Sequence, residues 1–199
     1  MNQLLKEAIE KRRSFYKISK EPVISDDEIA GIVQHAAQYA PTAFNSQSAR
    51  VLLLLNKEHD KLWTLTKEIL KGVIPPAQFA PTEEKIQSFQ DGYGTVLFFE
   101  EQATVTDLQQ KFPIYRENFP LWSLQSSGML QYIVWMLLED AGFGVSLQHY
   151  SPLIDEKVKS AWNIPESWML LGEMPFGKPL AAPEVKSFLP LDDRIKVYK

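Results

Sequence analysis

No charged side chain occurs between Asn118 and Leu138, and beyond Gly128 apolar residues occupy both the face with the 3.6-residue period and the faces beside it. A helix that is apolar nearly all round is a buried one, and either lipid or protein can bury it. The stretch also contains side chains that would be costly in a hydrocarbon layer without partners, namely Ser123, Gln125, Ser126, Ser127 and Gln131. We therefore predict a central helix buried in protein, and no membrane span.

The residues after this helix predict a short strand with a polar exit. Two acidic residues and then Gly142 and Gly144 end the helix, and a glycine turn leads into a strand at residues 143–147. Polar side chains follow at once, at Ser146, Gln148, His149 and Tyr150. A buried helix that delivers the chain to such a strand predicts a wall of the core beside a binding site.

Hydrophobic periodicity places further elements along the chain. The 3.6-residue pattern, with its caps and its proline or glycine stops, predicts helices at residues 2–13, 25–40, 62–70, 86–89, 107–111 and 152–162. Apolar runs predict strands at residues 51–55, 95–99 and 168–174. The aliphatic run at residues 51–55 is typical of a strand buried on both faces. Alternating strands and helices indicate an α/β or α+β domain, with a central sheet flanked by helices.

The size of the chain favours one domain with an attached tail. With 199 residues, of which 45% are hydrophobic, the chain can bury one sizeable core, so we predict a single domain at residues 1–199. The segment after Pro179 contains prolines and apolar residues such as Phe188 and Leu189. It is too apolar for a disordered end. Such a tail needs a surface to lie on, either the chain's own body or a partner subunit.

Composition excludes several kinds of function. The net charge is -4 and the basic residues are dispersed, whereas nucleic-acid binding needs clustered cations. The absence of cysteine excludes disulfides, thiolate nucleophiles and cysteine-ligated metals. The three histidines share no ligand spacing, so we expect no metal site. The first residues are charged and amphipathic and lack the apolar core of a secretory signal, which predicts a cytoplasmic protein.

Common enzyme motifs are also missing. There is no G-x-S-x-G motif, because Gln148 stands where the closing glycine after Ser146 would be, and there is no G-x-G-x-x-G motif for a dinucleotide. Glu100 and Glu101 follow a predicted strand and could form an acid–base couple. Adjacent strand residues point to opposite faces, however, so we interpret this pair as solvated charge.

What remains is a set of polar residues at the ends of predicted elements. They are Arg12, Arg13 and Ser14; Pro41, Thr42, Asn45 and Gln47; Ser146, Gln148 and His149; and Lys186 with Arg194. Two arginines, a serine and a lysine can form a cradle for one phosphate group through charge-assisted hydrogen bonds. The two amide side chains can bind the edge of a heterocycle or sugar-like hydroxyls. The sequence therefore predicts a nucleotide-like ligand with one phosphate, held over apolar walls.

These residues carry a resemblance to a known family. Four motifs occur in order: Arg12-Arg13-Ser14 after the first helix, P-T-A-F-N-S-Q at residues 41–47, G-F-G-V-S-L-Q-H-Y at residues 142–150, and L-G-E-M-P-F-G-K-P at residues 171–179 before a lysine-bearing tail. In this order and over essentially the whole chain, the sequence resembles the compact branch of the FMN-dependent nitroreductase superfamily. The resemblance implies an α+β fold with a central mixed sheet, in a domain-swapped homodimer with two FMN molecules at the interface.

The resemblance also implies roles for individual residues. The FMN phosphate and ribityl end would be held by Arg12, Arg13 and Ser14 of one subunit together with Lys186. The ribityl chain and ring edge would meet residues of the other subunit, namely Pro41, Thr42, Asn45 and Gln47. Ser146, Leu147 and Gln148 would pass beside flavin N5 and offer their backbone amides. The extended tail would embrace the partner.

At two positions the sequence departs from the family pattern. Many members carry a basic residue two positions after the serine, facing the flavin pyrimidine, and here that residue is Tyr16, with Lys17 beside it. Many also carry an arginine two positions after the tail lysine, and here that residue is Phe188, so that Arg194 is the candidate to replace it.

The implied activity is transfer of a hydride from NAD(P)H, through flavin N5, to a nitroaromatic, quinone or hydroperoxide acceptor in a ping-pong scheme. The flavin supplies this chemistry, so no catalytic side chain is expected. Phe44, Tyr115 or Trp122 could line the acceptor pocket, although a core position is favoured for Trp122. One alternative is a flavin-binding regulatory or stress-response protein with little turnover. Another is a cofactor-free interaction protein, whose polar clusters are only caps and turns.

Overall fold

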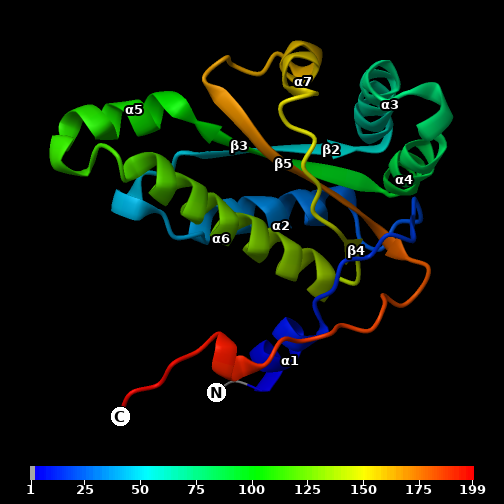
Figure 1. Ribbon diagram of the computed structural model, residues 1–199. Helices are drawn as coiled ribbons and strands as arrows, with labels where there is room; N and C mark the ends of the chain where they lie inside the picture. Colours follow the sequence, from blue (N-terminus) through cyan, green and yellow to red (C-terminus); the bar gives the residue numbers. More distant parts are fainter. Residues whose placement is uncertain (1–2) are drawn as a thin grey trace.

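The computed structural model describes residues 3–199, and its centre is a sheet of five strands (Figure 1). The strand order is β1 (Ile18–Ser19), β5 (Trp168–Pro179), β3 (Gly94–Glu101) and β2 (Ala49–Leu55), and β4 (Gly144–Val145) also pairs with β5. All four ladders between these strands are antiparallel. The mixed character expected for the sheet is confined to one isolated parallel bridge, between Ser14 and Val145. Together with the helices, the sheet gives the α+β fold of the prediction.

Helices cover the two faces of the sheet (Figure 1). One face carries α2 (Asp26–Tyr39) and α6 (Phe119–Asp140), whose apolar side chains pack on alternate residues of β3 and β5. The other face carries α3 (Asn56–Val73), α4 (Ala80–Gln90) and α7 (Asp155–Trp162), packed on the intervening residues. The remaining α-helices are α1 (Gln3–Lys11) and α5 (Gln102–Lys111), and short 3₁₀ turns are η1 (Ala43–Asn45), η2 (Pro76–Gln78), η3 (Pro113–Tyr115) and η4 (Leu191–Asp193).

Most predicted elements are confirmed where the local signals are strong. The cap predicted before α2 is a complete capping box, in which Ser25 and Glu28 each bond the other's backbone amide. The glycine turn after α6 contains Gly142 at φ +97°, a left-handed conformation that favours glycine. The two-residue strand β1 was not predicted, because two residues carry no periodicity. The part of the first helix that falls on residues 1–2 lies outside the described residues.

Two predictions about burial are wrong for the chain by itself. Strand β2 is not buried on both faces: it stands at the end of the strand order, and most of its side chains are only half-buried. Helix α6 is not buried all round either, because α2 and the sheet cover one side only. Its other side leaves large apolar residues exposed, which we call the α6 stripe: Leu121, Leu124, Met129 and Tyr132.

The two ends of the described chain extend away from the sheet (Figure 1). Helix α1 and the tail after β5 lie on the side of α6 and leave apolar residues such as Leu4, Val185 and Phe188 exposed. None of the described helices is long and apolar enough to cross a membrane. A cytoplasmic location stays a prediction from the sequence.

Candidate functional site

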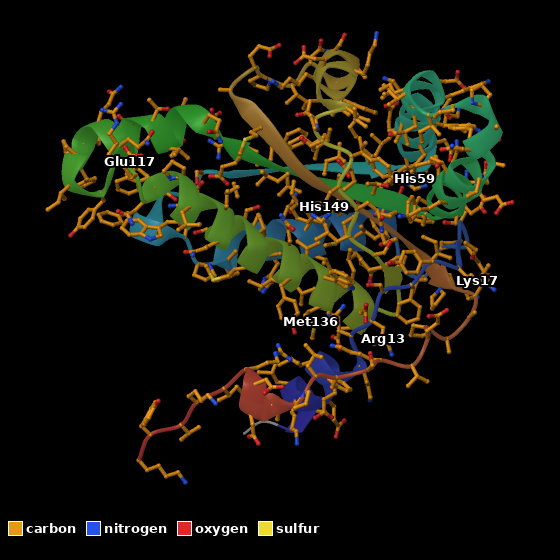
Figure 2. All side chains as sticks on the ribbon, viewed as in Figure 1. Arg13, Lys17, His59, Glu117, Met136 and His149 are labelled. Carbon is orange, nitrogen blue, oxygen red and sulfur yellow. The ribbon has the colours of Figure 1, made fainter. Side chains whose placement is uncertain are left out.

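A cavity of about 560 Å³ lies between the segment after α1 and the first part of the tail. Five of the predicted ligand-binding residues line it together: Arg12, Arg13, Ser14, Tyr16 and Lys186. Lys17 and Glu184 line it as well, and Figure 2 shows Arg13 near the end of α6 and Lys17 farther along, near the end of β5. The cavity therefore joins four cationic side chains and one carboxylate at a place where the sequence predicts a phosphate cradle.

The C-terminal end of α6 and strand β4 fix the backbone of this segment. The Glu139 carboxylate accepts from the Arg13 amide at 3.3 and 3.2 Å, and the Phe15 amide donates to the Val145 carbonyl at 2.9 Å. A Cβ added at Gly144 would lie 2.9 Å from the Cβ of Phe15, so glycine permits the close approach of β4. The arginines thus start from a backbone anchored at two points.

The side chains of the two arginines point to different partners. The Arg12 guanidinium lies over the Trp135 ring, 4.6 Å from its centre. The Arg13 guanidinium donates to the backbone carbonyl of Glu184 and so ties the tail to the segment after α1. Lys186 lies over the Phe188 ring, at 5.3 Å. Both arginines are half-buried, so part of each side chain remains open to a ligand.

The predicted role of the residues after β4 needs a correction. The Ser146 amide donates to the Pro175 carbonyl at 3.2 Å, and the Gln148 amide donates to the Glu173 carbonyl at 2.7 Å. These two amides are therefore already used within the sheet and are not free for a flavin. The Leu147 amide has no hydrogen-bond partner among the described residues, so it is the one of the three that remains available.

A second cavity, of about 470 Å³, lies between the loop before β2 and the first half of α6. The loop contributes Pro41, Thr42, Ala43 and Phe44, and the helix contributes Trp122, Gln125, Ser126 and Met129. The Ser126 hydroxyl holds the loop by accepting from the Ala43 amide at 3.3 Å. Trp122 is half-buried and lines this cavity, so the core position favoured from the sequence is wrong.

The loop at this cavity is strained. Phe44, Asn45 and Gln47 have φ values of 58°, 50° and 48°, in the left-handed region that side chains other than glycine rarely adopt. Each such residue costs about 1–3 kcal/mol, and the surrounding structure has to supply that free energy. The side chains of Asn45 and Gln47 are exposed. A loop that holds two exposed amide side chains at this cost is typical of a ligand-binding segment.

Aromatic rings surround Phe44, which lines the second cavity together with Trp122. The Phe44 ring is stacked on Trp122, with centres 6.0 Å apart and planes at 16°, and its other ring neighbours are Phe112, Tyr115 and Phe119. Phe44 remains 50% exposed, so this stack presents an aromatic surface to solvent. Such a surface favours flat, apolar ligands.

The second cavity lies along the first half of α6, whereas the segment that lines the first cavity is held by the last turn of α6. Ser126 holds the loop of the second cavity, and Glu139, thirteen residues further along the helix, holds the segment of the first. At the helical rise of about 1.5 Å per residue, these two anchors are about 20 Å apart. One chain therefore does not bring Asn45 and Gln47 next to Arg12 and Arg13. Arg194, at the end of η4 within the tail, does not line the first cavity, and its role in phosphate binding stays a prediction.

Burial changes the acidity of several carboxyl groups. Burial raises the pKa of Glu139, and the hydrogen bonds from Trp135 and Arg13 oppose that rise. Burial raises the pKa of Glu173 to about 8. Glu100 is fully buried and burial raises its pKa, so the interpretation of this residue as solvated charge is wrong. Among residues 3–199, no group of three potential ligand side chains could hold a metal ion.

Sequence reasoning missed three residues that shape the site: Glu139, Ser126 and Lys17. A signal existed for Glu139. A carboxylate in the last turn of a helix faces the negative end of the helix dipole, so its presence there calls for a donor partner. In the structure that partner is the Arg13 amide, 126 positions away in the sequence. Ser126 gave no such signal, because a serine in an apolar helix commonly bonds its own backbone.

The sequence was compared with known proteins. The sequence model of the nitroreductase family matches residues 9–178. The protein HBN1 of Saccharomyces cerevisiae, described as a nitroreductase, is 34% identical over 187 residues, which cover 92% of each chain. Nitroreductase CinD of Lactococcus lactis, in complex with nicotinic acid, is 39% identical with a TM-score of 0.92 over 98% of this chain and 100% of its own. CinD has also been solved with chloramphenicol and with 4-nitrophenol.

A more distant structure shares the fold alone. It is a protein of Exiguobacterium sibiricum in complex with FMN, 15% identical, with a TM-score of 0.71 over 97% of this chain and 96% of its own.

Proposed function

Because this chain belongs to the nitroreductase family, whose members are FMN-dependent oxidoreductases, we propose that it binds FMN with the phosphate in the cavity beside Arg12 and Arg13. The observation that carries the proposal is the meeting of these arginines with Ser14 and Lys186 in one cavity, although they come from both ends of the sequence.

The side chains present fit a phosphate group. Arg12, Arg13, Lys17 and Lys186 bring four positive charges against the single carboxylate of Glu184. Hydrogen bonds between such cations and a phosphate are short and about twice as strong as those between neutral groups. Arg13 already donates to a tail carbonyl, so a phosphate would share or replace that bond. The free Leu147 amide, close to β4, is the donor left for another part of the ligand.

A homodimer completes the proposed site. The α6 stripe, α1 and the tail expose apolar side chains on one side of the sheet, and such surfaces are normally covered by a partner. The loop at residues 41–47 lies about 20 Å along α6 from the arginines of its own chain. In the proposed dimer a second chain brings its own Asn45 and Gln47 to the flavin, while the tail packs on the partner.

FMN bound there would supply the redox chemistry, accepting a hydride from NAD(P)H and passing it from N5 to a nitroaromatic, quinone or hydroperoxide acceptor in a ping-pong scheme. The chain's own part is to bind, orient and exclude water. The aromatic wall around Phe44 and Trp122 offers a flat acceptor a surface to stack on. That 4-nitrophenol binds to CinD, at 40% identity, supports acceptors of this shape.

Replacing Arg12 by alanine tests the phosphate role. We expect Arg12→Ala to weaken FMN binding by about 10- to 100-fold, because a hydrogen bond to a charged group contributes about 1.5–3 kcal/mol. The measurement is fluorescence titration of the apoprotein with FMN, with thermal unfolding to show that the fold is intact. Lys11→Ala is the matched control, because Lys11 is a neighbouring cation that does not line the cavity. Equal FMN affinity in wild type and Arg12→Ala would contradict the assignment.

A further inference from the structure

The last turn of α6 contains a carboxylate with a specific set of partners. Glu139 accepts from the Arg13 amide through both oxygens, at 3.3 and 3.2 Å, and from the indole of Trp135 at 2.6 Å. It is half-buried, and it stands where the helix dipole disfavours a negative charge. Burial and the helix dipole both disfavour a negative charge at this position, and the hydrogen bonds from Arg13 and Trp135 offset that cost.

The same contacts reach both arginines of the proposed phosphate site. Glu139 binds the backbone at Arg13 and fixes the indole of Trp135, and the Arg12 guanidinium stacks on that indole at 4.6 Å. The Glu139 carboxylate therefore sets the backbone position of one arginine and the side-chain position of the other. It does not itself line the cavity.

From this geometry, and resting on the proposed function, we propose that Glu139 is a positioning residue: through the Arg13 amide and the Trp135 indole, it holds the arginine pair in place for the FMN phosphate. It acts without touching the ligand. Small displacements matter here, because charge-assisted hydrogen bonds to phosphate depend on geometry as well as on charge. Loss of Glu139 should therefore reduce the part of the affinity that the phosphate supplies and leave the flavin-ring part unchanged.

Riboflavin, which is FMN without its phosphate, separates positioning from general structural support. The test measures the Kd of FMN and of riboflavin for the apoprotein, and takes the ratio of the two. Wild type should prefer FMN, and Glu139→Ala should narrow that preference by about tenfold, since misplacement of about 1 Å can cost up to 100-fold. Trp135→Phe keeps an aromatic face for Arg12 but removes the indole donor, so an intermediate ratio is expected. Asp140→Ala removes the same charge one residue further on and should leave the ratio unchanged.

The Kd values of FMN and riboflavin separate a positioning role of Glu139 from a structural one. If Glu139→Ala weakens FMN and riboflavin equally, Glu139 is only structural and the inference is overturned. If Arg12→Ala narrows the ratio and Glu139→Ala does not, the phosphate site stands and the inference alone falls. If wild type shows no preference for FMN, the phosphate site itself falls, and the role of Glu139 with it. Should Glu139→Ala fail to fold, Trp135→Phe decides instead, because it removes the indole donor that links Glu139 to the Arg12 side chain. A wild-type ratio in Trp135→Phe would then overturn the inference.

Discussion

The two faces of the sheet differ in how far the chain completes them by itself. On the side of α3, α4 and α7, large side chains such as Trp63, Phe89 and Ile154 are fully buried. On the side of α6, the α6 stripe is exposed, a loop is strained, and the two cavities that contain predicted ligand-binding residues are open. The first face is a finished core. The second leaves large apolar side chains exposed to a partner in the proposed dimer, and the residues with candidate chemistry lie there.

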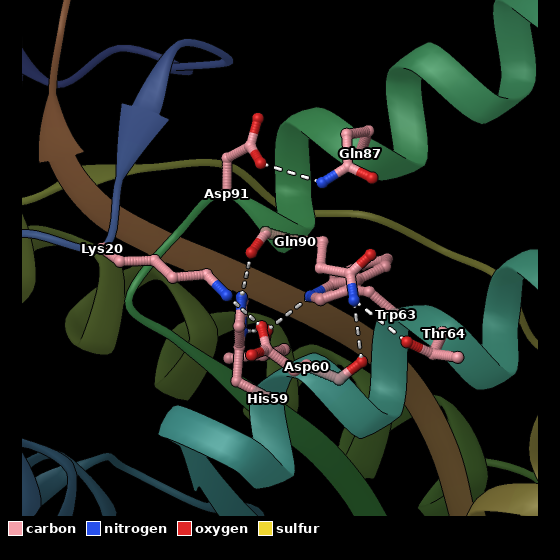
Figure 3. A network of polar contacts seen from close by, with 9 residues as sticks. Lys20, His59, Asp60, Trp63, Thr64, Gln87, Gln90 and Asp91 are labelled. Atoms are coloured by element: carbon pink, nitrogen blue, oxygen red, sulfur yellow. Dashed lines mark hydrogen bonds and ion pairs between the residues drawn. The ribbon is translucent and has the colours of Figure 1, made fainter.

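The polar network around His59 illustrates the finished face (Figure 3). His59 Nε2 lies 3.3 Å from the Gln90 carbonyl, which can only accept, so Nε2 carries the proton. His59 Nδ1 then accepts from the Thr95 hydroxyl at 2.8 Å, and that hydroxyl accepts from the Trp63 indole at 2.9 Å. The neutral histidine is thus satisfied at both nitrogens, within residues of this one chain.

The largest contrast is expected from two tryptophans, one on each face. Trp63→Ala should lower the free energy of unfolding by about 3–5 kcal/mol, because it removes a fully buried ring. Trp122→Ala should lower it less, by about 1–2 kcal/mol, because Trp122 is half-buried and loses three ring contacts rather than a fully enclosed position. Urea unfolding of both variants measures the difference. Equal losses would show that the α6 side is as complete as the other.

A smaller effect is expected from the acidity of His59. Burial lowers its pKa to about 4, against an ordinary value of 6.5, so between these values the unfolded chain binds more protons than the folded one. His59 should therefore contribute a fall of about 3 kcal/mol in the free energy of unfolding as the pH drops from 6.5 to 4. Glu173, whose pKa burial raises to about 8, should contribute a rise over the same range, so the contribution of His59 is the difference between wild type and a His59 variant.

Urea unfolding at several pH values tests this, with His59→Gln and His149→Gln compared. His59→Gln should remove the fall contributed by His59 between pH 4 and 6.5, and His149→Gln, at an exposed histidine, is the matched control that should keep the wild-type profile. A wild-type slope that persists in His59→Gln would assign the acid sensitivity to another group.

The smallest expected change concerns the strained loop. Gln47→Gly should raise the free energy of unfolding by about 1 kcal/mol or less, because glycine adopts φ near 48° without strain but loses more chain entropy on folding. Ser46→Gly is the matched control, since Ser46 has an ordinary φ of -64°, and it should be destabilising. The same Gln47 variant should bind FMN less well. A stabilised variant with unchanged FMN affinity would separate the strain from ligand binding.

The fold was predictable where local signals are strong, and the site only in part. The cap at Ser25 and the apolar run of β3 placed their elements correctly. An apolar pattern does not say whether the chain itself or a second molecule covers a helix face, so the burial of α6 was overestimated. The prediction that Glu100 is solvated was wrong for a related reason: a charged residue is expected at the surface, and only tertiary packing shows that this one is buried.

The candidate site shows the same limit. The sequence correctly predicted that Arg12, Arg13, Ser14 and Lys186 lie in one cavity, because binding one phosphate group requires several cationic side chains. It could not reveal that the amides of Ser146 and Gln148 are used by β5, nor that Glu139 reaches Arg13. Those contacts depend on register and on packing between distant elements, which the residue types alone do not determine.

The visible absorption spectrum of the purified protein, before and after anaerobic addition of NADH or NADPH, tests the central claim most directly. We expect an oxidised flavin spectrum that bleaches with one or both nucleotides. A flavin that stays oxidised would contradict the oxidoreductase proposal and favour a regulatory flavoprotein. A protein that remains colourless after reconstitution with FMN would contradict the cofactor assignment itself.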